Sequence, residues 1–246
     1  MGSPRKFLTA EWRYLAMLNY EMEPAALRPY VPAGTELDPW NGRTLISLVG
    51  FLFLNTRVLG VRLPMYQDFE EVNLRFYVRR KTPDGWRRGV VFIKEMVPRW
   101  FIAKVARTFY QENYIALPMQ HILEINAEDN RVYVTYSWRF KERWNGLQMR
   151  AAGPPQPLTP GSQEEFITEH YWGYTAWRNG ESREYQVEHP RWRVWRPTEC
   201  AVDCDAAQLC GPAFVEPLKA KPCSAFLAEG SPVTVYRGTK IKANSL

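Results

Sequence analysis

The clearest pattern in the chain is a strict alternation of polar and apolar residues over positions 71–79. Successive side chains of a β-strand point to opposite faces, so this period of two predicts a strand with one apolar face. The other face carries Glu71, Asn73 and Arg75. A strand that covers a core on one side therefore presents two charged groups and an amide together on the other side.

More strands are predicted before and after this one. Residues 44–55 form an apolar run rich in β-forming residues, and its length and the preceding Asn-Gly turn favour a buried strand. Turn sequences at 83–85 (Pro-Asp-Gly) and 179–180 (Asn-Gly) indicate antiparallel hairpins. The predicted strands are residues 12–22, 44–55, 71–79, 86–96, 121–126, 131–140, 174–178, 182–189 and 233–237.

Three segments have helical signals instead. They are residues 24–28, 98–110 and 162–171. In the second, apolar residues recur every four positions, and in the third Ser162 precedes Glu165 by three residues, which is a capping-box pattern. Because strands outnumber helices by about three to one, we expect a mainly β (α+β) protein with an antiparallel sheet closed into a barrel. A few short helices would lie against that barrel.

Composition agrees with a single folded domain over residues 1–246. The chain is 46% hydrophobic and 24% charged, with a mean hydropathy of -0.40. Its 10 Trp, 13 Tyr and 12 Phe favour wide pleated surfaces or a lined cavity. There is no apolar run of membrane-spanning length, and Glu11 and Arg13 interrupt any signal-peptide segment, so we expect a cytoplasmic protein without membrane contact.

Charge and cysteine content narrow the function classes further. A net charge of +6 admits a nucleic-acid binder as an alternative, but the basic residues form no contiguous stripe, so no nucleic-acid partner is expected. The four cysteines, Cys200, Cys204, Cys210 and Cys223, lack the paired spacing of zinc sites. We therefore expect neither a metal nor a cofactor, and the sequence assigns these cysteines no role.

Seven short motifs carry a resemblance over nearly the whole chain. In order they are residues 27–34 (Leu-x-x-Tyr-Val-Pro-x-Gly), 69–78 (Phe-Glu-Glu-Val-Asn-Leu-Arg-Phe-Tyr-Val), 89–92 (Gly-Val-Val-Phe), 106–114 (Ala-Arg-x-Phe-Tyr-x-x-x-Tyr), 166–171 (Phe-Ile-Thr-Glu-His-Tyr), 187–192 (Val-Glu-His-Pro-x-Trp) and 228–235 (Ala-Glu-Gly-Ser-Pro-Val-Thr-Val). Their order resembles the uncharacterised YqjF-like family of the acetoacetate decarboxylase-like superfamily. The resemblance implies one antiparallel closed barrel around a central cavity.

The resemblance does not bring the decarboxylase mechanism with it. Acetoacetate decarboxylases form a Schiff base through a lysine in the motif Arg-Glu-x-x-Gly-x-Pro-Lys-Lys. Aligned without gaps from Arg107, this motif meets Tyr114 and Ile115 at its two lysine positions. The nearest amines, Lys94 and Lys104, do not occupy the motif position, and we expect both to be solvated or salt-bridged.

The acid of the family's barrel strand does have a counterpart, because Glu71 resembles the glutamate that decarboxylases place there. The candidate ligand-binding residues are Glu71, Asn73, Arg75, Arg107, Tyr110, Tyr114 and His189. An arginine fork could hold a carboxylate or carbonyl, and Glu71 could pair with Arg75 in the empty protein. The same charges could instead form a buried network that only stabilises the barrel, and His189 could equally be a structural histidine.

The expected function is the binding of a small anionic or carbonyl-containing organic molecule in the barrel cavity. Whether this molecule is turned over stays open, so no catalytic residue is assigned. A noncatalytic structural or binding barrel is the alternative from another class. A homo-oligomer is compatible with the sequence.

Overall fold

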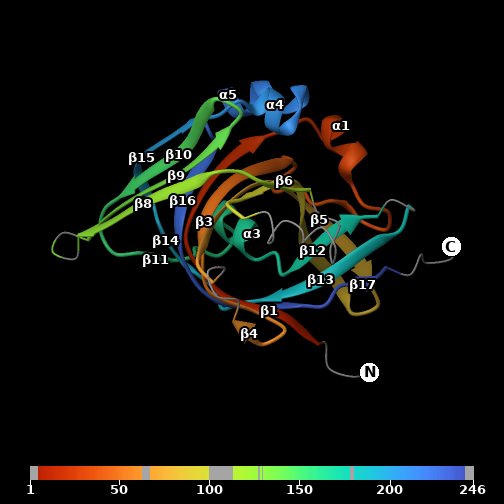
Figure 1. Cartoon of the computed structure of the whole chain (residues 1–246). Coiled ribbons are helices and arrows are strands. Elements are labelled where there is room, and N and C mark those ends of the chain that lie inside the picture. Colours follow the sequence, from red (N-terminus) through yellow and green to blue (C-terminus); the bar gives the residue numbers. More distant parts are fainter. Residues whose placement is uncertain are drawn as a thin grey trace.

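The computed structural model describes residues 5–62, 67–99, 113–126, 128, 130–177 and 180–241. Within this part of the chain the strands form two sheets, and the helices are few and short (Figure 1). The prediction of a mainly β protein is confirmed.

The larger sheet holds 13 strands in the described residues. They are β1 (Lys6–Glu21), β2 (Glu36–Leu37), β3 (Leu45–Val58), β4 (Val61–Arg62), β5 (Phe69–Thr82), β6 (Gly85–Val97), β7 (Tyr114–Ala116), β11 (Gln156–Pro157), β12 (Trp172–Ala176), β13 (Ser182–Glu188), β14 (Arg193–Trp195), β16 (Ser224–Tyr236) and β17 (Thr239–Lys240). Ten of these follow the order β11-β14-β16-β1-β3-β5-β6-β12-β13-β17. The other three, β2, β4 and β7, pair with β5, β3 and β6.

One additional pairing brings two distant strands of this order together. β13 also pairs with β16, through Val187 with Val235 and Glu188 with Thr234. Strand pairing therefore runs in a complete circuit, from β16 through β1, β3, β5, β6, β12 and β13 and back to β16. These pairs are antiparallel except for β12 with β6, and β7 also joins β6 in parallel. Apart from these two parallel pairs, the sheet is antiparallel, as expected.

A second sheet covers the outer face of the larger one. It has the order β15-β10-β9-β8, with β8 (Met119–Asn126), β9 (Arg131–Phe140), β10 (Arg143–Ala151) and β15 (Pro197–Asp203). Its inner face contributes Tyr136, Trp138 and Leu147 to a core cluster that also contains Leu48 and Leu74 of the larger sheet. Burial on both faces explains why β3 reads as a continuous apolar run rather than an alternating one.

The helices are short and lie at the ends of strands. They are α1 (Pro24–Leu27), η1 (Arg28–Tyr30), α3 (Gln163–Thr168), α4 (Ala206–Cys210), η2 (Pro212–Phe214) and α5 (Val215–Lys219). α3 lies within the curve of the larger sheet (Figure 1), where Phe166 and Ile167 join a second core cluster with Tyr77. The described strands thus have one apolar cluster outside the curve and another inside it.

Most expected elements are present with shifted ends. Each of the nine predicted strands lies within or overlaps an observed one. The Ser162 N-cap is present, because the Glu165 amide donates to Ser162 Oγ at 3.1 Å, but the Glu165 carboxylate accepts from the Gly161 amide instead of closing the box on Ser162. The third helix ends at Thr168 rather than at residue 171, since Glu169 leaves helical geometry at ψ 40°. Most of the expected helix over 98–110 lies outside the described residues. β10 and β15 were not predicted, because their sequences lack a clean alternation.

The contact between the two sheets predicts a specific sensitivity. A Cβ added at Gly50 of β3 would stand 2.6 Å from the Tyr136 ring of β9. We expect Gly50→Ala to lower the unfolding free energy by about 1–3 kcal/mol, since the packed ring must move. Gly146→Ala is the matched control, because the nearest atom to its added Cβ is 3.4 Å away. Urea denaturation measures both, and equal losses in the two variants would contradict the close packing at Gly50.

Candidate functional site

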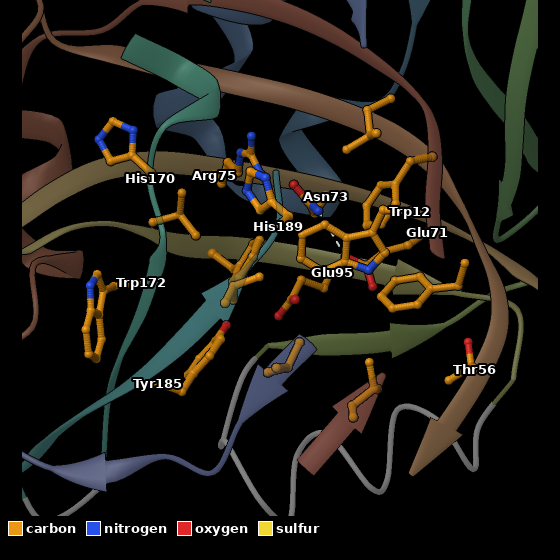
Figure 2. A pocket seen from close by; sticks show the side chains of 18 of the residues that line it. Trp12, Thr56, Glu71, Asn73, Arg75, Glu95, His170, Trp172, Tyr185 and His189 are labelled. Carbon is orange, nitrogen blue, oxygen red and sulfur yellow. Dashed lines mark hydrogen bonds between the residues drawn. The ribbon is translucent and has the colours of Figure 1, made fainter. Parts of the chain in front are cut away.

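The larger sheet curves around a cavity of about 140 Å³. Side chains from β1, β3, β5, β6, β12 and β13 line it, together with residues at and after α3. A cavity of roughly 150 Å³ holds a benzene molecule, so the space suits a ligand of about six to eight non-hydrogen atoms. Figure 2 shows the polar side chains that reach it.

The polar face of β5 forms one wall of this cavity. Glu71, Asn73 and Arg75 all line it, with exposed fractions of 3%, 2% and 8%. Their apolar neighbours Val72 and Leu74 lie in the core cluster on the other side of the sheet. The alternation over residues 71–79 thus places the three predicted side chains in the cavity wall (Figure 2).

Glu71 is held by two hydrogen-bond donors. Asn73 Nδ2 donates to Oε1 at 2.9 Å, and the Tyr114 hydroxyl donates to Oε2 at 3.3 Å. Burial raises the pKa of Glu71 to about 7, against the opposing effects of these hydrogen bonds and of the Arg75 charge. This carboxyl group therefore exchanges its proton near neutral pH.

Arg75 does not form the expected ion pair with Glu71. Within the described residues, no carboxylate lies within the 4.0 Å ion-pair distance of its guanidinium group. Its Nη2 lies 3.8 Å from the sulfur of Met17, its guanidinium carbon lies 5.9 Å from the centre of the Tyr77 ring, and its Nε has no hydrogen-bond partner. The prediction of a Glu71–Arg75 pair is wrong: the Glu71 oxygens accept from Asn73 and Tyr114, and Nη2 of Arg75 is directed to the sulfur of Met17. Among the described residues, Arg75 is thus a buried cation with no carboxylate partner.

A second carboxylate, Glu95, lines the cavity and was missed by the sequence analysis. In β6, Leu74 pairs with Lys94 and Arg75 pairs with Phe92, so Ile93 is an extra residue that forms a β-bulge. The bulge turns Lys94 away and brings Glu95 to the cavity, with an exposed fraction of 1%. Simple alternation from Phe92 would have placed the lysine there.

Lys94 lies outside the cavity as expected. Its amine donates to Asn113 Oδ1 at 3.0 Å on the surface. Tyr114 of β7 lines the cavity beside Glu71. The other two predicted site residues on this segment, Arg107 and Tyr110, lie outside the described residues, as does Lys104.

His189 also lines the cavity, beyond the end of β13. Its Nδ1 lies 2.9 Å from the Pro190 carbonyl oxygen, and its ring stacks on Trp192 with 4.1 Å between ring centres. Burial lowers its pKa, and the Arg75 charge acts in the same direction. The imidazole is therefore held neutral beside the guanidinium group.

His170 is a second histidine in the wall, which the sequence analysis did not single out as a site residue. Its Nε2 lies 3.2 Å from Asp38 Oδ2, and Arg88 Nε donates to the same oxygen at 2.7 Å. Burial lowers the pKa of His170 to about 4, although Asp38 favours the charged form. His170 is therefore also neutral at physiological pH.

Aromatic rings form much of the remaining wall. The Trp12 ring meets Phe51 and Phe53 edge to face, with centres 5.5 Å and 5.7 Å apart, and Phe53 stacks on Phe69 at 4.7 Å. All four rings line the cavity. The site thus combines a polar side built on β5 and β6 with an apolar aromatic side.

The remaining expectations concern cysteines, metals and membranes. All four cysteines are free, and burial raises the pKa of Cys210 to about 12, so it is an unreactive thiol. Among the described residues there is no cluster of three or more metal-ligating side chains. No described helix is long and apolar enough to cross a membrane.

Comparison with known proteins agrees with this architecture. A model of the DUF2071 family, described as an uncharacterized conserved protein, matches residues 9–232. The chain is 28% identical over 180 residues to the uncharacterized protein YqjF of Bacillus subtilis strain 168, which covers 73% of this chain and 72% of that protein.

Solved structures show the same fold at low sequence identity. Acetoacetate decarboxylase from Legionella pneumophila matches 100% of this chain and 90% of its own, with a TM-score of 0.63 and 13% identity. An acetoacetate decarboxylase-like enzyme from Sphingomonas wittichii RW1 matches 97% of this chain and 94% of its own, with a TM-score of 0.68 and 11% identity. The enduracididine biosynthesis enzyme MppR, solved with pyruvate, matches 100% of this chain and 93% of its own, with a TM-score of 0.65 and 11% identity. The predicted acetoacetate decarboxylase-like fold is confirmed.

The raised pKa of Glu71 predicts a pH-dependent stability. The folded chain keeps this proton up to about pH 7, whereas a glutamate in the unfolded chain loses it near 4.5. The protonated Glu71 therefore contributes its full stabilisation of the fold below pH 4.5, and this contribution is lost as the pH rises through 7. We expect Glu71→Gln to abolish this loss and to exceed the parent in stability at pH 8 by roughly 3 kcal/mol.

Urea denaturation of both proteins between pH 4.5 and 8 measures this difference. His170 acts in the opposite direction, because its lowered pKa costs stability as the pH falls from 6.5 towards 4, but it does so in both proteins. Subtracting the unfolding free energy of the parent from that of Glu71→Gln at each pH cancels the contribution of His170 and leaves that of Glu71. A difference that does not change with pH would show that this carboxyl group is ionised throughout.

Proposed function

The chain belongs to the DUF2071 family of uncharacterized conserved proteins, and on the geometry of its cavity we propose that it binds a small organic acid there. In this proposal the guanidinium group of Arg75 receives the carboxylate of the ligand. The cavity lies inside a closed barrel, and the aromatic wall contacts the apolar part of the bound acid.

Barrel closure is supported by the strand pairing. The ring from β16 through β1, β3, β5, β6, β12 and β13 is completed by the two residue pairs between β13 and β16. A closed ring isolates its interior from bulk water, and in such an interior an arginine binds an anion more strongly than at a surface.

The observation that carries the proposal is the unpaired charge of Arg75. This side chain is 8% exposed, lines the cavity, and has no carboxylate within ion-pair distance in the described residues. Burying an isolated cation is costly, so a structural arginine normally has a paired acid. A planar carboxylate provides the missing partner, because its two oxygens match the guanidinium fork.

The size and surroundings of the cavity support an acid of a few carbons. About 140 Å³ admits a small ligand, and the rings of Trp12, Phe51 and Phe53 offer it apolar contact. MppR, which shares the fold, has been solved with pyruvate, a carboxylate of that size. The proposal extends this ligand class to the present chain.

The proposal does not include Schiff-base chemistry. Among the described side chains that line the cavity there is no lysine, and the bulge in β6 turns Lys94 to the surface. A purely structural barrel is the competing interpretation, and it predicts no ligand at Arg75.

Replacing Arg75 separates these interpretations. We expect four-carbon carboxylic acids to raise the melting temperature of the parent, by the linkage that gives ~2.7 kcal/mol at a hundredfold excess over Kd. Arg75→Met should abolish this shift. Without ligand, it should raise the unfolding free energy at pH 6 by about 1 kcal/mol or more, because it removes an unpaired buried charge.

Arg43→Met is the matched control, because Arg43 pairs with Glu21 at the surface, outside the cavity. It should keep the ligand-induced shift. A screen of small acids that stabilises neither the parent nor the control, together with a destabilised Arg75→Met, would favour the structural barrel.

Borohydride treatment tests the absence of imine chemistry. With acetoacetate or pyruvate present, we expect no covalent adduct, because an imine requires a lysine amine at the bound carbonyl. Intact-protein mass spectrometry measures the outcome. A stoichiometric adduct on one lysine would overturn this part of the proposal and would identify the reactive residue by peptide mapping.

A further inference from the structure

The polar atoms around Arg75 are mainly hydrogen-bond acceptors. From this imbalance we infer that the ligand is a carboxylate that also carries a hydrogen-bond donor, such as an amino acid or a hydroxy acid, rather than a plain or 2-oxo acid. The inference rests on the proposed function, because it assumes that a carboxylate binds at Arg75. It adds the chemistry of the group next to that carboxylate.

His189 presents an acceptor to the cavity. A carbonyl oxygen can only accept, so the 2.9 Å contact with Pro190 requires the hydrogen of the neutral ring to be on Nδ1. Nε2 then carries a lone pair and no hydrogen. Stacking on Trp192 keeps the ring in this orientation. This histidine can therefore receive a hydrogen bond from a ligand but cannot donate one.

The same reasoning applies to His170. The carboxylate of Asp38 already accepts from Arg88, and an ionised carboxylate can only accept, so His170 Nε2 must carry the hydrogen. Its Nδ1 is buried and has no hydrogen-bond partner. A second imidazole in the cavity wall is thus fixed as an acceptor by a contact behind it.

Asn73 adds a third acceptor between Glu71 and Arg75. Its Nδ2 donates to Glu71, which directs Oδ1 away from that carboxyl group. This Oδ1 atom has no hydrogen-bond partner, although the side chain is only 2% exposed. An unpaired buried amide oxygen costs about 1–3 kcal/mol, and a ligand donor at this position would recover that loss.

The described donors near these atoms are mostly occupied. The Tyr114 hydroxyl donates to Glu71, and Trp192 Nε1 donates to Ser231 Oγ at 2.8 Å. Two donors in the wall, Trp12 Nε1 and the Thr56 hydroxyl, have no partner. The Trp12 ring is packed against Phe51 and Phe53, and Thr56 lies far from Arg75 (Figure 2). A 2-oxo group would add another acceptor to a site that already has a surplus of acceptors. An amine or a hydroxyl group would instead satisfy them.

A series of four acids with one carbon skeleton tests the inference. Butyrate, 2-oxobutyrate, 2-hydroxybutyrate and 2-aminobutyrate differ only in the group on the second carbon, and isothermal titration gives the Kd of each. We expect the hydroxy or the amino acid to bind at least tenfold more tightly than butyrate and 2-oxobutyrate. Both enantiomers are measured, because fixed acceptors on one side of the cavity should favour one of them.

Two variants locate the acceptors. His189→Phe keeps a ring that can stack on Trp192 but removes the Nε2 lone pair, and Asn73→Leu removes Oδ1. Each should reduce the ratio of the butyrate Kd to the Kd of the donor-bearing acid, with both constants measured on the same variant. His121→Phe is the control, because His121 lies on β8 outside the cavity and pairs with Glu70. It should leave all four affinities unchanged.

The outcomes separate this inference from the proposed function. Equal affinities for all four acids, or tighter binding of 2-oxobutyrate, would overturn the inference while the carboxylate site at Arg75 stands. An advantage of the donor-bearing acid that survives in both variants would also overturn it. Binding of none of the acids to the folded parent would overturn the proposed function itself.

Discussion

Burial of β5 on both faces is the constraint on which the cavity depends. The second sheet covers one face of this strand, and the larger sheet curves around the other. Neither set of side chains can turn to water, so every polar group on the inner face must find a partner in the cavity or remain without one. Glu71 finds two partners, whereas Arg75 finds no carboxylate among the described residues. This difference between two residues of one strand is why we propose Arg75 as the residue that receives the ligand.

The electrostatics of the site follow from the same burial. Two histidines are held neutral beside a permanent cation, and the pKa of Glu71 is raised to about 7. Each of these groups avoids a charge of its own, while the arginine cannot, because its pKa lies far above physiological pH. The one permanent charge among these groups is therefore that of Arg75, and the same wall also holds the carboxyl group of Glu95. A fixed cation in the wall is consistent with our proposal that Arg75 receives a carboxylate.

The sequence was most informative where a strand is regular. The alternation over residues 71–79 was sufficient to place Glu71, Asn73 and Arg75 on one face, and the capping box located the start of α3. It failed where geometry depends on neighbours. The ion pair expected between Glu71 and Arg75 ignored the competition from Asn73 and Tyr114, which only the folded chain brings together. The role of Glu95 depends on a β-bulge, and no residue type in β6 marks its position.

Because of the β-bulge in β6, the backbone conformation decides which side chain of this strand faces the cavity. Ile93 is the single extra residue that exchanges Lys94 for Glu95 at the inner face. If the same sequence paired without the bulge, alternation would continue from Phe92 and turn the Lys94 amine inward in place of the Glu95 acid. The functional group on this wall therefore depends on whether the strand is bulged, and not only on which residues it contains. Homologues that align well in sequence here can still differ in the functional group that their cavities present.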